Sequence, residues 1–469
     1  MAKPFPFLKL PSELRDQIYS HYLEPILDLG PCEFGGGYPG GTYSYNLDLL
    51  RVCQQIYSEA NDVWRREHLF VRIDTPWEQA VNHISHEGLV PIVAMGNNAK
   101  LFQRYHSLVK INAPEHFLTH LSHAIIIRLE DLHRFAQMWY YSALNYEALN
   151  QHLRVTLALT NPSSDGKEIS KDMQKDLLLP FGNIKSLDSV AVHGFDSALE
   201  KELRRLMAIP YDSPQKCCED ATALMESGDR AIIDGDAADA LDRYIKAFHA
   251  IHILINGRER RILADHFFHH EMNGGRYQGQ SGTTVRIILR IKLVARCVNA
   301  YLKLKEYSEA AFWGMRSIRI MRDTIGADFE DFLIQVAGML DAGILYVRTG
   351  VAIRNLEHAQ SSELDTYAED GGFAKSECLF RIAGKFLKGD NRNLIKKELE
   401  DNNIKMPEEF FFDGDEGTGS DIDSLAHMEH MAAEAEMAEQ NVAQVHMTMP
   451  SQTIEGDGSH MQNYLHTDL

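Results

Sequence analysis

Two stretches near the start of the chain decide how its first part folds: residues 10–19 (LPSELRDQIY) and residues 49–60 (LLRVCQQIYSEA). In the first stretch, Pro11 suits the beginning of a helix, where its missing N–H would have no partner in any case. The apolar residues that follow keep a four-residue spacing, which places them on one helical face: Leu14, Ile18 and Tyr22. The stretch therefore predicts a short amphipathic helix.

The second stretch predicts another amphipathic helix. Its apolar residues alternate steps of three and four and form one continuous stripe: Leu50, Cys53, Tyr57, Ala60 and Trp64. Between the two helices, residues 35–42 (GGGYPGGT) have the composition of a flexible loop. This loop satisfies the spacing G-x-G-x-x-G, but it lacks the preceding strand that a dinucleotide site needs. We expect a helical head over residues 5–66.

This head resembles the F-box and the F-box-like heads of filamentous-fungal proteins, through LPxELR at residues 10–15 and LLRVCxQIY at residues 49–57. The resemblance implies a substrate-recognition adaptor of an SCF-type ubiquitin ligase, in which the rest of the chain holds an unknown client protein. By position, it also implies the residues that would contact a Skp1-like adaptor: Leu10, Pro11, Leu14, Ile18, Val52 and Cys53. The head departs from the F-box pattern in two ways. Its connection over residues 25–46 is longer and richer in glycine, and the tryptophan that often follows Val-Cys is absent.

The residues also allow a second interpretation, in which the chain is an interaction scaffold without ligase function and the head is structural. An apolar stripe on a small helical head needs a partner surface, either in its own next domain or in another protein. The two interpretations differ in one observable, which is whether the leucine-proline turn and the first helix are exposed or are covered by residues 68–210.

Charge and composition exclude several classes of protein. The 469 residues carry a net charge of −20, but the 64 residues after Lys405 contain 14 acidic side chains and no Lys or Arg, so the remaining chain carries only −6. A nucleic-acid binder would need a basic face, which this balance does not provide. No stretch approaches the roughly 18 apolar residues of a membrane span, and six scattered cysteines imply no disulfide framework. We expect a protein of the cytoplasm or nucleus that binds neither nucleic acid nor membrane.

Residues 67–212 alternate short β-branched runs with helical stretches. The runs predict strands at residues 69–73, 124–127, 155–159 and 189–192, and the helical stretches lie at 132–150 and 171–178. Such alternation predicts parallel strand pairing with crossover helices.

Residues 213–405 are predicted to be helical and to resemble tetratricopeptide repeats. Small and aromatic residues occur at the relative spacings of that repeat, and Ala310 lies in a second, partial match: Gly228, Ala240, Tyr244, Ala247 and Ala310. Small residues let two antiparallel helices approach closely, and the aromatic residue fills the gap between them. The glycine-rich segment 274–282 interrupts the array as a loop, and a third helical pair is expected around residues 332–347.

Residues 406–469 are rich in Asp, Gly, Ser, Met, His and Gln, a composition that predicts a disordered acidic tail. The fold class expected for the whole chain is therefore α+β and predominantly helical. Its four parts are the F-box-like head, a strand-helix alternating domain, a tetratricopeptide-like helical domain and the tail.

Candidate catalytic and metal sites are weak. His266, His269 and His270 precede Glu271 in an order that differs from the His-Glu-x-x-His of a zinc helix, so a helix end is the simpler interpretation. Cys217 and Cys218 are interpreted as inert thiols, and no nucleophile, base and orienting group are brought together by the sequence. We expect no enzyme activity, no metal and no cofactor.

Overall fold

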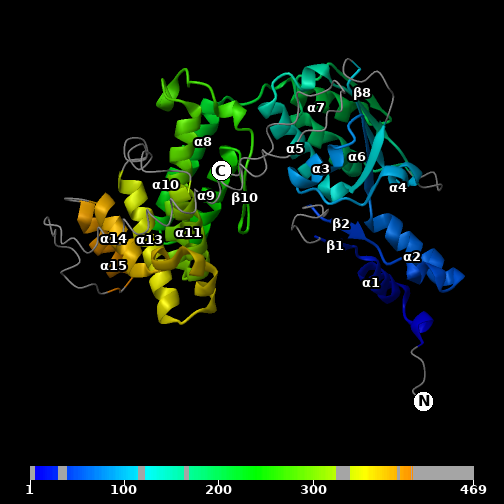
Figure 1. Ribbon diagram of the computed structural model, residues 1–469. Helices are drawn as coiled ribbons and strands as arrows, with labels where there is room; N and C mark the ends of the chain where they lie inside the picture. Colours follow the sequence, from blue (N-terminus) through cyan, green and yellow to red (C-terminus); the bar gives the residue numbers. More distant parts are fainter. Residues whose placement is uncertain are drawn as a thin grey trace, which may run out of the picture. The chain divides into compact units, whose positions relative to one another are not determined.

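The computed structural model describes residues 6–29, 40–114, 122–162, 168–323, 339–387, 391–402 and 404. The chain divides into two compact units (Figure 1). Unit 1 comprises Met1–Ala223 and Lys246–Ile287, and unit 2 comprises Leu224–Ile245 and Ile288–Leu469. The predicted tail lies outside the described residues, as do 35–39 of the predicted loop and 332–338 of the expected third helical pair.

Unit 1 begins with the helical head, whose two helices are α1 (Ser12–Leu23) and α2 (Gln54–Glu67). Pro11 precedes α1 as its N-cap residue, in agreement with the helix start predicted from the sequence. Between the helices, β1 (Ile26–Asp28) pairs antiparallel with β2 (Thr42–Ser44). Residue 40, just before β2, must be a glycine, because a Cβ atom there would lie 2.5 Å from the carbonyl oxygen of Val90.

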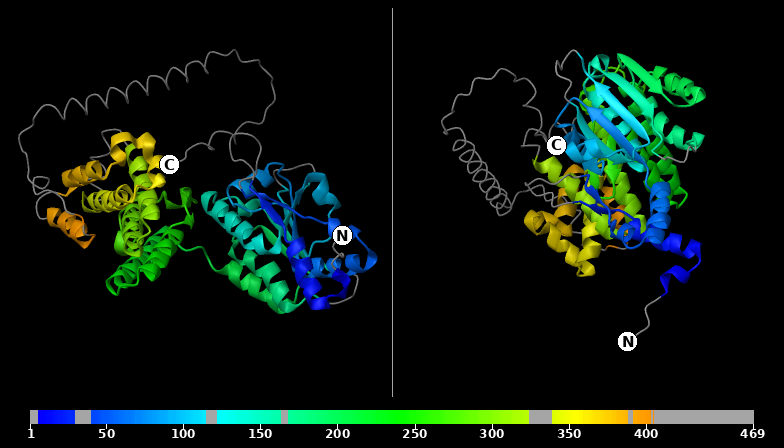
Figure 2. Two further views of the ribbon diagram at one scale, coloured as in Figure 1. Left: turned by 90° about the horizontal axis from the view of Figure 1, so that it is seen from below. Right: turned by 90° about the vertical axis from the view of Figure 1, so that its right-hand side faces the viewer.

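A six-stranded sheet forms the centre of unit 1, and Figure 2 shows its strands side by side. The strands are β3 (Phe70–Thr75), β4 (Ala94–Met95), β5 (Ser107–Asn112), β6 (His123–Arg128), β7 (Arg154–Leu159) and β8 (Ser189–His193). Their order across the sheet is β4-β6-β3-β5-β7-β8. The four predicted strands correspond to β3, β6, β7 and β8, whereas β4 and β5 were not predicted.

The predicted parallel pairing is wrong for most of this sheet. Strands β3 and β5 are parallel, as are β7 and β8, but β3 with β6, β4 with β6 and β5 with β7 are antiparallel. The error follows from a reversal of chain direction between β5 and β6: β3, β4 and β5 run one way and β6, β7 and β8 run the other, so strands of the two sets that lie side by side are antiparallel.

The two faces of the sheet carry two separate apolar cores. Along β6, Ile125 and Ile127 belong to one core, and Ala124 and Ile126 belong to the other, as the two-residue period of a strand requires. The first core is completed by α3 (Ala80–His86), α5 (Leu132–Asn145), α6 (Lys171–Leu178), η5 (Leu179–Asn183) and α7 (Ser197–Ala208). The second core is completed by α1, α2 and α4 (Gly96–Leu101), so the head is packed on the sheet.

Residues 246–287 also belong to unit 1. The hairpin of β9 (Ile253–Asn256) and β10 (Glu259–Ile262) is held by Arg261, which donates to the backbone carbonyls of His86 and Glu87. Buried Arg286 donates to the carbonyls of Ile251, His252 and Leu263. The segment 274–282, predicted as a loop, contains the short 3-10 helix η7 (Gly275–Tyr277), and its last residue begins α10. The β9–β10 hairpin departs from the wholly helical structure predicted for residues 213–405.

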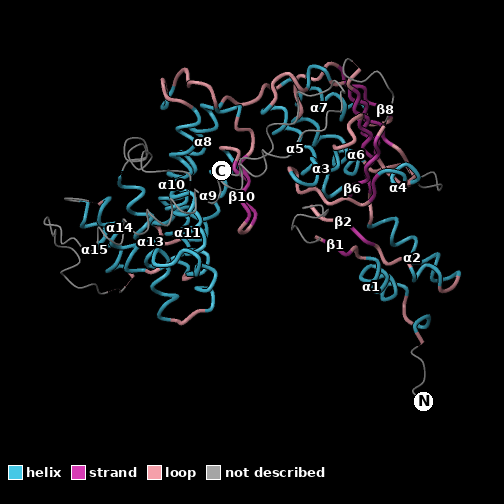
Figure 3. Tube along the Cα trace, in the orientation of Figure 1, coloured by secondary structure: helices cyan, strands magenta, loops and turns pink. Residues whose placement is uncertain are grey.

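The described part of unit 2 is helical (Figure 3). Helices α8 (Pro214–Ile233), α9 (Ala237–Ala250) and α10 (Gly282–Leu304) each begin or end in unit 1 and contribute their other turns to unit 2. The remaining helices are α11 (Tyr307–Asp323), α13 (Met339–His358), η8 (Ser362–Ala374), α14 (Ser376–Phe386) and α15 (Arg392–Asp401). Helix α13 packs against α11 and α14. The chain is thus mostly helical with one mixed sheet, which agrees with the predicted fold class at that level.

Within the described residues, no helix has both the length and the apolar character that crossing a membrane requires.

Candidate functional site

Helix α1 presents two rows of side chains with the same four-residue spacing. The inner row consists of Arg15, Tyr19 and Leu23, which are 9%, 0% and 0% exposed. The outer stripe consists of Leu14, Ile18 and Tyr22, which are 45%, 42% and 39% exposed. The apolar face recognised in the sequence is therefore the one turned to the surface, and the helix packs through a row that includes an arginine.

The inner row is bound to α2 through hydrogen bonds to one carboxylate, that of Glu59. Arg15 donates to Glu59 through Nε (2.8 Å to Oε2) and Nη2 (2.6 Å to Oε1). The hydroxyl of Tyr19 donates to the same Oε2 at 2.8 Å, and Gln55 donates to Oε1 at 3.0 Å. Arg15 Nη1 also donates to the backbone carbonyl of Leu10, so the same side chain holds the leucine-proline turn.

These bonds set the protonation states of the groups involved. Hydrogen bonding to Arg15 is the main reason that the pKa of Glu59 is lowered to about 2, although partial burial opposes the shift. Burial is the main cause that raises the pKa of Tyr19 to about 12, with the bond to Glu59 acting in the same direction. At neutral pH the cluster is therefore a charged Arg15–Glu59 pair with a neutral tyrosine, and it fixes α1 on α2.

The other residues implied by the F-box resemblance lie mostly at the surface. Pro11 is exposed and Leu10 is half-buried. Val52 is 63% exposed, and Cys53 is an exposed free thiol directly before α2. The structure thus leaves Pro11, the outer stripe residues Leu14 and Ile18, and the Val52–Cys53 pair uncovered by the described parts of unit 1.

The apolar stripe predicted for α2 is wrong in part. Ala60 and Trp64 are buried as expected, but Cys53 and Tyr57 are exposed and Leu50 is only half-buried. The buried face of α2 consists of Ile56, Ala60, Asn61, Val63 and Trp64. Trp64 directs this face toward the sheet, because its ring lies 5.4 Å from that of Phe70 in β3. The buried face therefore keeps Ala60 and Trp64 from the predicted stripe and has Ile56 and Val63 in place of Cys53 and Tyr57.

Sequence reasoning did not identify the cluster of Arg15, Tyr19 and Glu59. The available signal was the spacing of residues 15, 19 and 23, which equals that of the outer stripe. An arginine at its first position argues for solvent exposure, so this spacing alone does not predict a buried row. The partner that allows this arginine to be buried lies 44 residues away in α2.

The residues assigned to repeat packing are all buried: Gly228, Ala240, Tyr244, Ala247 and Ala310. Gly228 lies against Tyr244, since a Cβ atom at that glycine would be 2.4 Å from the tyrosine ring. The Tyr244 hydroxyl donates to Asp229 at 2.8 Å, and Arg296 donates to the same carboxylate. The α8–α9 contact therefore has a small residue facing a large one.

The histidines and cysteines considered as candidate metal-binding or catalytic residues do not form such a site in the described residues. The rings of His266 and His269 lie 4.7 Å apart, and His270 Nε2 lies 3.6 Å from Glu147. No group of three or more potential metal ligands is found in the part of the chain that the structure describes. Cys217 and Cys218 are buried, and burial raises the pKa of each thiol to about 12, so neither is a reactive thiolate.

Comparison of this chain with family models, with curated proteins and with solved structures finds no match.

Proposed function

We propose that this chain is a substrate-recognition adaptor of an SCF-type ubiquitin ligase, in which the helical head binds a Skp1-like adaptor and the remaining parts hold a client protein. The observation that carries the proposal is the exposure of the outer stripe, Leu14, Ile18 and Tyr22. A stripe that only capped the next domain would be covered by it. In this chain the head caps the sheet through its inner row and Trp64.

The rigidity of the head supports the same proposal. Docking through a few side chains is favoured when those side chains are already held in place, because less conformational entropy is then lost on binding. The Arg15–Glu59 pair fixes α1 on α2 and also holds the carbonyl of Leu10. The exposed side chains of the leucine-proline turn and of α1 thus belong to one pre-organised surface.

Binding of the purified full-length chain to a purified Skp1-like adaptor, measured by isothermal titration calorimetry, tests the proposal. The variant Leu14→Glu/Ile18→Glu places two charges on the outer stripe and is expected to abolish binding. Leu10 is not a suitable site for the test, because it is half-buried and its carbonyl is bonded to Arg15.

The matched control is Ile209→Glu/Ile233→Glu, which makes the same change at two residues outside the head that are 48% and 83% exposed. This variant is expected to bind as the unmodified chain does. Absence of binding by the unmodified chain, or equal loss in both double variants, would contradict the adaptor function. An interaction scaffold with a structural head would then be the remaining interpretation.

A further inference from the structure

A buried histidine lies where residues 246–287 meet helix α5 in unit 1. This residue, His252, is 4% exposed, and its φ of +56° is a left-handed conformation that is uncommon for a residue other than glycine. Four aromatic rings surround the imidazole with centroid distances between 5.2 and 5.8 Å, two from α5 and two from residues 246–287: Tyr140, Tyr141, Phe267 and Phe268. A titratable side chain is thus enclosed within an apolar contact.

The hydrogen-bonding groups around the imidazole favour its neutral form. Its Nε2 lies 3.5 Å from the hydroxyl of Tyr140 and 3.9 Å from the thiol of Cys217. Burial raises the pKa of Tyr140 and raises that of Cys217 to about 12, so both groups keep their protons and can donate to Nε2. Nδ1 has no hydrogen-bond partner among the described residues. Protonation would direct an N–H group of the ring at two donors and would place a charge among aromatic rings.

The charged groups near His252 act mainly in the same sense. Burial is the main reason that the pKa of His252 is lowered to about 3, and the charge of Arg286 adds to the shift. Arg286, in α10, donates to the backbone carbonyl of His252 at 3.1 Å and is itself paired with Asp265. Asp212, before α8, raises the pKa of His252 without reversing the shift. The other titratable groups facing the ring are uncharged at neutral pH: Tyr140, Tyr141 and Cys217.

The apolar contact that contains this histidine is small. The cluster that joins α5 to residues 246–287 has three buried members: Tyr141, Leu144 and Ala264. The two cores on the faces of the sheet contain no residue of 246–287. Parts of a protein that bury little apolar surface open at a lower free energy than its main core. The protonation state of one buried group can therefore decide whether this contact stays closed.

We propose that His252 is a pH switch for this contact: the neutral ring holds residues 246–287 on α5, and protonation of the ring releases them. In the open state the ring is in water with the ordinary histidine pKa of about 6.5, so the open state binds a proton more strongly than the closed state does. Each unit of pH below that value therefore favours opening about tenfold, until the pH reaches the lowered pKa of the closed state. The switch lies outside the head and does not depend on the adaptor function.

Hydrogen–deuterium exchange of the full-length chain, measured by mass spectrometry from pH 7.5 to pH 5, tests the switch. Dividing the intrinsic exchange rate at each pH by the measured rate gives the protection of β9 and β10. In the unmodified chain this protection is expected to fall about thirtyfold between pH 7.5 and pH 5. In His252→Asn it should not change with pH, because asparagine tolerates a positive φ and does not titrate. His252→Phe keeps an aromatic ring and serves where asparagine alone opens the contact.

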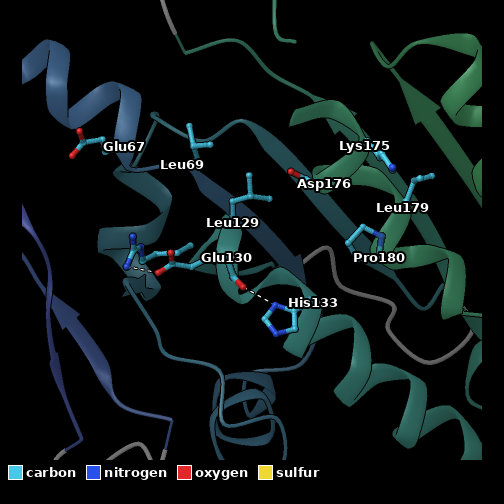
Figure 4. A pocket seen from close by; sticks show the side chains of 10 residues that line it. Glu67, Leu69, Leu129, Glu130, His133, Lys175, Asp176, Leu179 and Pro180 are labelled. Carbon is cyan, nitrogen blue, oxygen red and sulfur yellow. Dashed lines mark hydrogen bonds and ion pairs between the residues drawn. The ribbon is translucent and has the colours of Figure 1, made fainter. Parts of the chain in front are cut away.

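Two other histidines provide the matched controls. His249→Asn removes a histidine whose Nε2 accepts from the backbone N–H of Ile255 in β9 at 3.2 Å. His133→Asn removes an exposed histidine of α5, whose Nδ1 donates to the carbonyl of Glu130 at 2.6 Å (Figure 4). Both controls should keep the thirtyfold fall. The proposal would be overturned by constant protection in the unmodified chain, by an equal fall in either His252 variant, or by loss of the fall in either control.

Discussion

Equally regular patterns predict the head helices α1 and α2 and the helix pair α8 and α9. The residues that carry the first pattern in α1 are exposed, whereas those that carry the second are buried. The outer stripe of α1 is turned to the surface, and the inner row, which includes a charged residue, is buried. In the second pair the recognised residues are themselves the contact, with Gly228 against the ring of Tyr244.

The difference lies in the size of the residues that carry the pattern. A glycine or alanine at a fixed helical position has at most a methyl group to pack on a partner, so its regular recurrence indicates that another helix comes close. A stripe of Leu, Ile and Tyr fits a core or a binding surface equally well. Spacing alone therefore identifies a packed face when its residues are small, but not when they are large and apolar.

Replacing a residue of the inner row should have the largest effect on stability. Tyr19 is fully buried, its ring lies 5.6 Å from that of Phe7, and its hydroxyl is bonded to Glu59. Tyr19→Ala is expected to lower the free energy of unfolding of unit 1 by about 3–5 kcal/mol, because it leaves a cavity and removes one donor from Glu59. Urea denaturation followed through the fluorescence of Trp64 and the other tryptophans measures this loss. A loss below about 1 kcal/mol would show that the inner row does not anchor α1.

A Cβ atom added between α8 and α9 should have the next largest effect. Gly228→Ala places a methyl group 2.4 Å from the Tyr244 ring, and overpacking of this kind costs about 1–3 kcal/mol. The control is Gly384→Ala in α14, where no described atom lies within 4 Å of the new Cβ and alanine should stabilise the helix by about 0.5–1 kcal/mol. Thermal unfolding followed by circular dichroism compares them, and shifts of the same sign would contradict the assigned contact.

Much of the secondary structure and part of the candidate site could be predicted from the sequence. The outer stripe and the strands β3, β6, β7 and β8 follow from short-range patterns. The strand β5 did not, because its sequence SLVKIN has the charged Lys110 within a short apolar run. The pairing directions depend on the reversal of the chain between β5 and β6, which no local pattern in the strands reveals. The Arg15–Glu59 pair joins residues 44 positions apart, and no local pattern connects them.

The ion pair within the head should have an intermediate effect that depends on pH. Glu59→Gln keeps an acceptor but removes the charge that faces Arg15, and a loss of about 1 kcal/mol is expected. The pKa of Glu59 is lowered to about 2 in the folded chain, so its contribution is fully present above the unfolded value near 4.5 and disappears as the pH falls through about 2.

Melting temperatures of the unmodified chain and of Glu59→Gln, measured from pH 7 down to pH 2, test this dependence. The difference between the two proteins should be constant above about pH 5 and should shrink below it. A difference that stays constant through the acid range would show that the charge of Glu59 does not contribute to the stability of the head.

The smallest effect on stability is expected from truncating the outer stripe, although the double variant Leu14→Glu/Ile18→Glu should abolish adaptor binding. Leu14→Ala and Ile18→Ala each remove a side chain that is already more than 40% exposed, and alanine has the better helix propensity, so each should change the free energy of unfolding by less than about 1 kcal/mol. The same urea titration used for Tyr19→Ala gives the comparison, since the two rows lie on one helix and differ by one position. A cost at Ile18 equal to that at Tyr19 would mean that the outer stripe is covered in the folded chain, and the head would then be a cap rather than a docking surface. A small loss of unfolding free energy for Ile18→Ala, together with a large loss for Tyr19→Ala, would show that the outer stripe does not pack in the folded chain and is available to a partner.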